Sequence, residues 1–323
     1  MTVLVTGGAG YIGSHVVNLL LDRGDSVVIV DDLVTGVQER VAGVPLTQID
    51  MSVSEAPDVL EKIMRDNDVD AVIHFAGRKQ VAESVARPAW YYQQNVGSLA
   101  NLLLAMESAA VKRLVFSSSA AVYGSSEGAS LQEDTPPRPI NPYGESKLIG
   151  EWLVADAVTS FGLRASSLRY FNVAGAGRPE LGDTAVLNLV PMVLERLDRG
   201  LSPLIFGADY DTDDGTCVRD YIHVLDLADA HLSTLDSLTE GDPRHDVFNV
   251  GTGIGSSVRA MVDEIVRVSG SEALPEVLGR RPGDPATVVA DPRLIFDTVG
   301  WTATRGLTEI VQSAWDSHLF LTR

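Results

Sequence analysis

The stretch VLVTGGAGYIG (residues 3–13) decides the fold class of this chain. An apolar run, Val3 to Thr6, leads directly into a glycine-rich turn, and the turn opens a helical pattern that extends from Tyr11 to Arg23. A strand, a tight turn and a helix in this order bring free N–H groups and the positive end of a helix dipole to one point, where a pyrophosphate can bind. The segment therefore predicts a dinucleotide-binding loop, although a structural turn between a strand and a helix can look the same.

An acidic residue strengthens this interpretation. Asp31 ends the next predicted strand, about 20 residues after the loop. A carboxylate there accepts hydrogen bonds from both ribose hydroxyls and repels a 2′-phosphate. The pattern therefore favours NAD over NADP.

Apolar runs alternate with helical patterns through the first half of the chain. We expect strands at Val3–Thr6, Ser26–Val30, Leu46–Asp50, Ala71–Phe75, Lys112–Ser117 and Arg164–Tyr170, and helices at Tyr11–Arg23, Glu55–Arg65, Ala89–Ala110 and Tyr143–Phe161. Continuous apolar strands indicate burial on both faces. The sequence predicts an α/β fold, a Rossmann doubly wound parallel sheet.

The alternation of strand and helix patterns ends at about Phe171, after which loops rich in Gly, Pro and Asp separate shorter elements. Helical stretches remain at Val186–Arg199, Leu225–Leu235, Val258–Val268 and Leu307–Leu319. We expect residues 1–171 to form the dinucleotide-binding domain, and residues 172–323 to form a smaller α/β substrate-binding domain with some segments returning to the sheet.

Composition excludes several classes of function. The 323 residues carry a formal charge of −19, which repels a phosphate backbone, so we expect no nucleic-acid partner. The single cysteine, Cys217, permits no intrachain disulfide. The N-terminus has no basic region ahead of its apolar stretch, and no apolar run approaches the roughly 18 residues that span a bilayer. We expect a cytoplasmic protein without a membrane partner.

A tyrosine and a lysine stand at a chemically meaningful spacing. Tyr143 and Lys147 are four residues apart, which places both on one helix face. The chain has only four lysines (Lys62, Lys79, Lys112 and Lys147), and chance would give about 0.1 such pairs. We therefore interpret the pair as functional.

The chemistry explains the pairing. A phenol with a pKa of about 10 needs roughly 4 kcal/mol of help to act as a base near pH 7. A lysine ammonium about 4 Å away supplies a comparable amount at an effective dielectric constant of 20, so we expect Lys147 to lower the pKa of Tyr143. Ser117, Ser118 and Ser119 follow a predicted strand, where a hydroxyl can contact a reacting alcohol; a serine-rich turn is the plain alternative.

The glycine loop and the Ser…Tyr-x-x-x-Lys set resemble the extended short-chain dehydrogenase/reductase superfamily. Within it, the whole chain resembles the UDP-glucose 4-epimerase family. The matching segments are VTGGAGYIGSH (5–15), VIHFAG (72–77), FSSSAAVYG (116–124), NPYGESK (141–147), LRYFNVAGA (168–176), DGTCVRDYIHVLDLADAH (214–231) and RRPGDPA (280–286).

The resemblance implies reversible epimerisation at C4 of a UDP-hexose through a 4-keto sugar, with NAD regenerated in each cycle. It assigns catalysis to Ser119, Tyr143 and Lys147. It assigns NAD binding to Gly7, Gly10, Tyr11, Ile12, Gly13, Asp31, Asp32, Leu33, Thr35, Gly36, Asp50, Met51, Phe75, Ala76, Gly77, Lys79, Gln94, Ser117, Tyr143, Lys147 and Phe171.

The resemblance also implies a UDP-sugar site. Its residues are Lys79, Ser119, Tyr143, Asn172, Asn188, Leu189, Leu204, Ile205, Phe206, Arg219, Arg281, Asp284 and Val288. Arginines suit the pyrophosphate, although any one of them alone fits an ordinary surface ion pair equally well.

Two positions depart from the family pattern. Gln94 replaces the first residue of an Asn-Asn pair, which puts that NAD contact in doubt. Val288 stands where bulk restricts the family's pocket, and a side chain this small leads to the hypothesis that N-acetylated hexoses are also substrates.

Alternative functions are a sugar-nucleotide 4,6-dehydratase and a non-catalytic NAD-binding regulator. The pattern of the dehydratases has Asp-Glu directly after the catalytic Ser/Thr, whereas this chain has Ala120-Ala121 there. A non-catalytic regulator is expected to have lost part of the Ser, Tyr and Lys set. We expect no metal, because Asp209–Asp220 departs from a calcium loop and His74 and His223 have no partner at ligand spacing.

A homodimer is also expected. Leu99, Leu102, Leu103 and Met106, with Leu148, Ile149 and Trp152, offer more apolar surface than one side of a sheet needs. A bundle of two long helices from each subunit would bury them, as in the family. The alternative is that all of them face the sheet.

Overall fold

The computed structural model describes residues 1–125, 130–239, 241–281 and 283–322. The chain forms two compact units. The first comprises Met1–Gly124, Pro136–Tyr170 and Ala228–Phe248; the second comprises Ser125–Thr135, Phe171–Leu227 and Asn249–Arg323. The chain thus changes unit between Tyr170 and Phe171, and residues 228–248 return to the first unit.

A seven-stranded sheet forms the centre of the first unit, in the order β10-β6-β5-β4-β1-β2-β3. Its strands are β1 (Thr2–Thr6), β2 (Ser26–Asp31), β3 (Leu46–Gln48), β4 (Ala71–His74), β5 (Arg113–Ser117), β6 (Arg164–Tyr170) and β10 (Arg244–Val250). The pairs from β6 across to β3 are parallel. This confirms the predicted Rossmann fold; β10 was not predicted.

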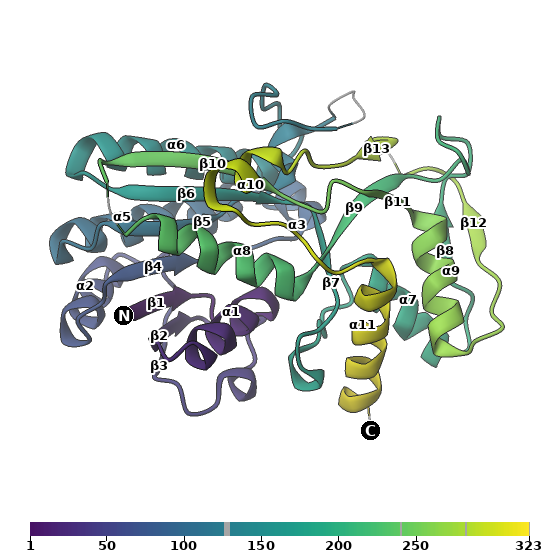
Figure 1. Ribbon diagram of the computed structural model, residues 1–323, viewed down its shortest axis with the longest axis horizontal. Helices are drawn as coiled ribbons and strands as arrows, with labels where there is room; N and C mark the ends of the chain where they lie inside the picture. The colour runs from purple at the N-terminus through teal and green to yellow at the C-terminus, as the bar shows by residue number, and fades with distance from the viewer. Residues whose placement is uncertain (126–129, 240, 282, 323) are drawn as a thin grey trace. The chain divides into compact units, whose positions relative to one another are not determined.

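Helices cover both faces of this sheet. They are α1 (Tyr11–Asp22), α2 (Ala56–Asp66), α3 (Val81–Ala86), α4 (Pro88–Tyr92), α5 (Ser98–Ala109), α6 (Pro142–Phe161) and α8 (Val224–Ser237), with the 3-10 turns η1 (Gln38–Val41) and η3 (Ala120–Tyr123). In Figure 1, α8 runs across the front of the sheet and α6 lies behind it. Because the strands from β6 to β3 are parallel, their carboxyl ends meet at one edge of the sheet, where ligands bind in such folds.

The helix expected from Ala89 to Ala110 is interrupted. Between α4 and α5 the backbone forms a π-helical segment, η2 (Gln93–Gly97). The side chain of Asn95 in this segment accepts a hydrogen bond from the backbone N–H of Arg78 at 2.7 Å and donates one to its carbonyl oxygen at 3.0 Å. A π-bulge of this kind is typical of functional sites, because it re-aims side chains out of the regular helix.

The second unit contains smaller sheets. β9 (Val218–His223) pairs with β7 (Asn172–Ala174), β11 (Gly255–Ser257) and β13 (Thr287–Val288), and β8 (Leu204–Phe206) pairs with β12 (Glu276–Leu278). The helices are α7 (Leu189–Asp198), α9 (Val258–Ser269), α10 (Arg293–Val299) and α11 (Leu307–Leu321), with the 3-10 turn η4 (Pro179–Leu181). A hydrophobic cluster that includes Val193, Ile265 and Ile310 holds α7, α9 and α11 together.

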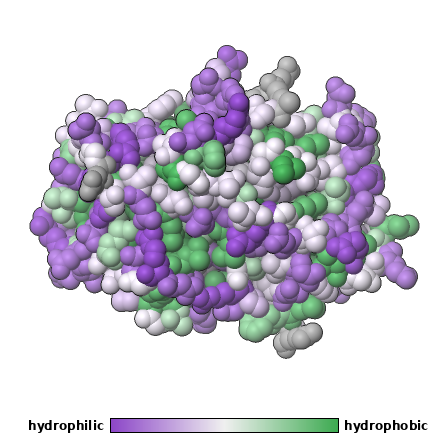
Figure 2. All heavy atoms as spheres, in the orientation of Figure 1, coloured by the Kyte–Doolittle hydropathy of each residue, from purple (hydrophilic) through white to green (hydrophobic). Residues whose placement is uncertain are grey.

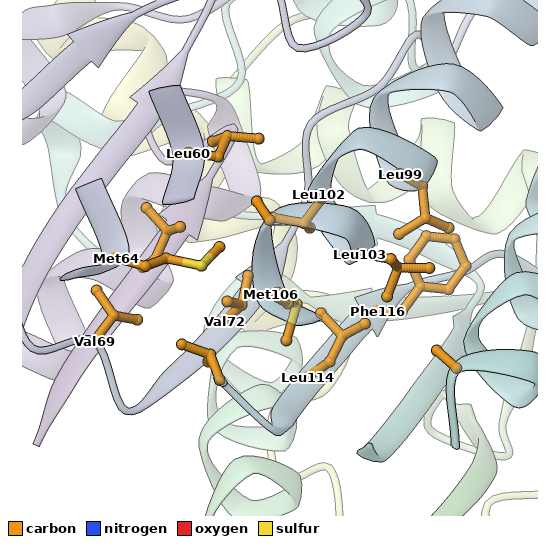
Figure 3. Packing of buried hydrophobic residues seen from close by; sticks show 14 of the residues in the cluster. Leu60, Met64, Val69, Val72, Leu99, Leu102, Leu103, Met106, Leu114 and Phe116 are labelled. Carbon is orange, nitrogen blue, oxygen red and sulfur yellow. The ribbon is translucent and has the colours of Figure 1, made fainter. Parts of the chain in front are cut away.

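The apolar side of α5 is buried within the first unit. Leu99, Leu102, Leu103 and Met106 pack against α2 and against Leu114 and Phe116 of β5 (Figure 3). Leu148 is also buried, whereas Trp152 of α6 and Leu104 of α5 are 58% and 54% exposed. Most of the surface expected to form a dimer interface is therefore core, because α2 covers the face of α5 that the sheet leaves open.

On the face shown in Figure 2, hydrophilic residues are spread over the surface with small hydrophobic groups between them. Within the described residues, no helix combines the length and apolar character needed to cross a membrane.

Candidate functional site

The first unit contains a pocket at the carboxyl ends of its strands, which we call the glycine-loop pocket. The empty space in it, including the open solvent at its mouth, is about 960 Å³. Eighteen of the residues expected to bind NAD line it: Gly7, Gly10, Tyr11, Ile12, Gly13, Asp31, Asp32, Thr35, Gly36, Asp50, Met51, Phe75, Ala76, Gly77, Lys79, Gln94, Tyr143 and Lys147. Ile49, Arg78, Ser98 and Tyr170 also line it and were not predicted.

Two glycines make the loop possible. Gly7 has a φ of +70°, and a Cβ on it would lie 2.7 Å from the amide nitrogen of Ala76. A Cβ on Gly13 would lie 2.2 Å from the carbonyl oxygen of Gly7. The turn therefore needs bare backbone at both positions. The first turn of α1 contains no acidic side chain, and no side chain of the described residues caps it. Its backbone N–H groups can therefore bind an anion.

Asp31 shapes the next wall of the pocket. Its carboxylate accepts hydrogen bonds from the backbone N–H groups of Ala9 at 3.0 Å and Leu33 at 2.8 Å. Burial raises the pKa of Asp31, and these two hydrogen bonds oppose the rise. Each carboxylate oxygen has a second lone pair, so the fixed side chain can still accept a hydrogen bond from a ribose hydroxyl.

The catalytic set lies at the same edge of the sheet. Asn141 caps α6 by accepting a hydrogen bond from Gly144 N–H, and the helix then carries Tyr143 and Lys147 into the pocket. Ser119 follows β5 and hydrogen-bonds the side chain of Tyr143. Lys147 Nζ donates a 2.7 Å hydrogen bond to the carbonyl oxygen of Ser117. The structure therefore brings the predicted serine, tyrosine and lysine together.

The lysine does not act on the phenol as we expected. Burial raises the pKa of Tyr143, and the hydrogen bond with Ser119 is the opposing influence. The ammonium of Lys147 is held by the Ser117 carbonyl oxygen, and burial lowers its pKa to about 8. The pKa of Tyr143 is therefore raised in this structure and not lowered as we predicted, because desolvation of the buried phenol is the largest influence on it.

The neighbouring titratable groups are neutral near pH 7. Burial, together with the charge of Lys147, lowers the pKa of His74 to about 3. Burial and the charge of Tyr143 raise the pKa of Tyr170, whose hydroxyl lies 2.7 Å from Ser117 Oγ. Lys147 is a buried cation on the same helix as the predicted base, four residues after it.

A buried ion pair fixes the segments that carry this set. Arg169 of β6 donates to both oxygens of Glu151 at 2.9 and 2.6 Å, and Ser118 Oγ donates to Glu151 at 2.5 Å. Glu151 lies four residues after Lys147 on α6. The pair therefore ties α6 to the end of β5, one residue before Ser119. The repeated spacing of Tyr143, Lys147 and Glu151 is a signal that the sequence analysis missed.

The second unit contains its own pocket, which we call the arginine pocket. The empty space in it, including the open solvent at its mouth, is about 940 Å³. Eight of the residues expected to hold the UDP-sugar line it: Asn172, Asn188, Leu189, Leu204, Phe206, Arg219, Arg281 and Asp284. The guanidinium of Arg281 lies 3.8 Å from the ring centre of Phe206. Seven further lining residues were not predicted: Leu187, Met192, Val193, Arg196, Cys217, Tyr221 and Val258.

Several expected contacts lie outside both pockets. Ile205 is fully buried in β8, and Val288 lies on β13 beside Arg219 of β9, so neither lines the arginine pocket. In the first unit, Leu33 and Ser117 contribute a backbone N–H and a carbonyl oxygen to neighbouring side chains instead of lining the pocket. Phe171 is buried in the second unit. No cluster of three or more metal-ligating side chains occurs among the described residues.

Comparisons with known proteins give relatives that match nearly the whole chain. Residues 3–251 match the NAD dependent epimerase/dehydratase family. The UDP-glucose 4-epimerase of Azospirillum brasilense is 46% identical over 325 residues, which cover 98% of this chain and 92% of the relative.

Two solved structures are similar over nearly the whole chain. The UDP-glucose-4-epimerase of Stenotrophomonas maltophila with bound NAD and formylated UDP-arabinopyranose has a TM-score of 0.95 and 37% identity, covering 100% of this chain and 99% of that one. The UDP-glucose 4-epimerase of Bifidobacterium longum in complex with NAD⁺ and UDP has a TM-score of 0.90 and 36% identity, covering 99% and 98%.

Proposed function

The chain belongs to the NAD dependent epimerase/dehydratase family, and from this premise we propose that it interconverts UDP-glucose and UDP-galactose with bound NAD. The observation that carries the proposal is that Tyr143 and Lys147 line the same pocket as the glycine loop, while Ser119 is hydrogen-bonded to Tyr143. The relatives named UDP-glucose 4-epimerase support the choice of reaction, and the solved relatives with NAD and UDP support the choice of ligands.

The glycine-loop pocket has the chemistry that NAD needs. The backbone N–H groups after Gly10 suit the pyrophosphate, and Asp31 suits the adenosine ribose. Met51, next to Asp50 in the pocket lining, is buried and offers an apolar side chain against which an adenine ring can pack. When bound, NAD supplies the acceptor for the hydride of the sugar C4 and gives the hydride back.

The arginine pocket has the chemistry that UDP needs. Arg219 and Arg281 offer two guanidinium groups to the second pyrophosphate, which compensates for the unfavourable average charge of −19. Phe206, Leu189 and Leu204 offer apolar surface to the uracil ring. We propose that the UDP part of the substrate binds here, and that the hexose reacts at Tyr143.

Proton transfer is the part of the reaction that the chain performs itself. Tyr143 as phenolate accepts the proton of the C4 hydroxyl while the C4–H bond breaks, which leaves a 4-keto sugar. Ser119, hydrogen-bonded to Tyr143, is placed to contact the same oxygen. In the return step Tyr143 gives the proton back to the C4 oxygen as the hydride adds to the opposite face, so atoms and electrons balance without a consumed reagent.

A turnover assay tests the proposal. Purified protein incubated with UDP-galactose and no added reductant is expected to form UDP-glucose. Tyr143→Phe, which keeps the ring but removes the base, is expected to lose about 10²- to 10⁴-fold in kcat. NAD binding of the variant, measured by fluorescence, serves as the control for an intact pocket. Absence of UDP-glucose with the unmodified chain contradicts the proposal.

The alternative functions need features that the site does not supply. A 4,6-dehydratase must expel the 6-hydroxyl with an acid next to Ser119, and the residues at that place are Ala120 and Ala121 of η3. A non-catalytic regulator has no use for the hydrogen bond between Ser119 and Tyr143 or for a buried ammonium. The same incubation distinguishes all three, because only an epimerase forms UDP-glucose without loss of water.

Three finer statements remain proposals. We propose a cytoplasmic location, and we propose a homodimer, whose interface now rests on the exposed Leu104 and Trp152. Light scattering at micromolar concentration tests the dimer, and a monomer contradicts it. Turnover of N-acetylated hexoses, predicted from the small Val288, is tested with UDP-N-acetylglucosamine; no turnover of it beside turnover of UDP-galactose contradicts that prediction.

A further inference from the structure

Arg78 is a residue of the glycine-loop pocket for which neither the fold nor the proton transfer gives a reason. It lies between Gly77 and Lys79 in the loop after β4, and its side chain is 16% exposed. Its guanidinium reaches acceptors on two other segments. One is Asp32, directly after β2, and the other is Gln94, in the π-helical segment η2.

The contacts form one continuous chain of hydrogen bonds. Arg78 Nη2 donates to Asp32 Oδ2 at 2.5 Å, and Nη2 and Nε donate to Gln94 Oε1 at 2.8 and 3.1 Å. Gln94 Nε2 donates in turn to Ser52 Oγ at 2.7 Å and to Asp50 Oδ2 at 3.3 Å. These hydrogen bonds therefore join the loops that follow β2, β3 and β4.

The strand order shows where these hydrogen bonds lie relative to the glycine loop. β1 lies between β4 and β2 in the sheet, so the glycine loop that follows β1 lies between the loop of Arg78 and the loop of Asp32. An ion pair between these two residues therefore crosses from one side of the glycine loop to the other. Both residues line the pocket in which the proposed function places NAD.

The loop of Arg78 is itself fixed. Asn95 accepts from its backbone N–H at 2.7 Å and donates to its carbonyl oxygen at 3.0 Å, and Asn95 also donates to Ser146 of α6 at 3.0 Å. The side chain of Arg78 can therefore swing while its backbone stays in place. The ring of Trp90, whose centre is 5.6 Å from the guanidinium, gives the cation a second surface to lie on.

We propose that Arg78 and Asp32 form a clasp that closes over bound NAD and slows its release. The inference rests on the proposed function, in which one NAD serves many cycles and gains nothing by leaving. The guanidinium also compensates the charge of Asp32, which would otherwise be a third unpaired carboxylate in the pocket lining beside Asp31 and Asp50. The Gln94 substitution noted in the sequence thus gives Arg78 a second acceptor beside Asp32.

The experiment measures the rate at which the complete protein, loaded with radiolabelled NAD, loses the label to an excess of unlabelled NAD. Arg78→Leu and Asp32→Asn are each expected to speed release about tenfold, and the double variant to release no faster than the faster single variant. Arg87→Leu is the matched control, because Arg87 also lies over Trp90, at 3.9 Å, but does not line the pocket. It is expected to leave the rate unchanged.

Whether Asp32→Asn speeds or slows NAD release distinguishes the clasp from the alternative role of Arg78, which is direct binding of the pyrophosphate. If Arg78 instead binds the pyrophosphate directly, Asp32 competes for it, and Asp32→Asn slows release; that result, or unchanged release from both variants, overturns the proposal. Asp32→Asn also keeps the proposal testable if Arg78→Leu does not fold, which thermal unfolding without NAD reports. If the unmodified chain binds no NAD at all, the proposed function fails and the clasp falls with it.

Discussion

Lys147 donates a hydrogen bond to the carbonyl oxygen of Ser117 across 2.7 Å, and this contact places a buried cation between the end of β5 and the helix of the predicted base. The side chain is 7% exposed, and its ring neighbour Phe116 lies 5.2 Å from Nζ. Burial lowers the pKa of Lys147 to about 8, so the cation exists below that pH and is lost above it.

The pH profile of activity is the first prediction. Because only the charged form of Lys147 stabilises a phenolate at Tyr143, kcat/KM is expected to fall as the pH rises above about 8. Lys147→Met is expected to lower kcat about 10²-fold or more at pH 7 and to remove that limb of the profile. Lys112→Met, at an exposed lysine, is the control and leaves the profile unchanged.

The same shift in pKa affects stability. The pKa of Lys147 is lower in the folded chain than the ordinary value of 10.5, so between about pH 8 and 10.5 the unfolded chain binds more protons. The contribution of Lys147 to the free energy of unfolding of the chain is therefore expected to rise with pH across that window. Urea unfolding of the unmodified chain and of Lys147→Met checks the sign; a difference between them that does not change with pH contradicts it.

The buried pair of Glu151 and Arg169 is expected to be costly to break. Glu151→Gln leaves the guanidinium of Arg169 without its carboxylate and is expected to lower the free energy of unfolding by about 3–5 kcal/mol. Glu195→Gln, which breaks the exposed pair with Arg199, is the matched control and is expected to cost about 0.5 kcal/mol or less. Urea unfolding measures both, and equal effects contradict the prediction.

The two pockets are expected to respond to mutation separately. Arg281→Ala removes a guanidinium from the arginine pocket and is expected to weaken UDP binding about 10- to 100-fold, with NAD affinity unchanged. Arg280→Ala is the matched control, because Arg280 lies over Tyr210 and pairs with Asp209 without lining that pocket. Calorimetric titration with UDP checks the effect; equal losses in both variants contradict the assignment.

The glycine loop is expected to tolerate no side chain at Gly13. A Cβ there would lie 2.2 Å from the carbonyl oxygen of Gly7, so Gly13→Ala is expected to abolish NAD binding and to lower the thermal unfolding temperature. Gly279→Ala, at a position with open space around it, is the control. NAD binding retained by Gly13→Ala contradicts the geometry of the loop.

The sequence predicted the sheet because most of the six expected strands are rich in Val, Ile and Leu and are bounded by turn residues. It did not predict β10, whose RHDVFNV sequence begins with charged residues and lies far along the chain from its neighbour β6. It also predicted one helix over 89–110, since the π-helical segment is produced by the contacts of Asn95 with Arg78, which local propensity does not encode.

The candidate site was predictable where a motif carries the chemistry. The glycines, Asp31, Tyr143 and Lys147 follow from spacing, and all of them line one pocket. Arg78 could not be predicted in the same way, because its importance comes from an ion pair with Asp32, 46 residues away in the sequence. The expected effect of Lys147 on Tyr143 failed because burial of the phenol depends on the packed structure.

The fate of the C4 hydrogen tests the central claim most directly. UDP-galactose carrying deuterium at C4 is incubated with the unmodified chain, and the product is analysed by mass spectrometry and nuclear magnetic resonance. The account predicts UDP-glucose with the deuterium still at C4, because the hydrogen leaves and returns within one site. Deuterium lost to the solvent, or an epimerised product with hydrogen at C4, would contradict it.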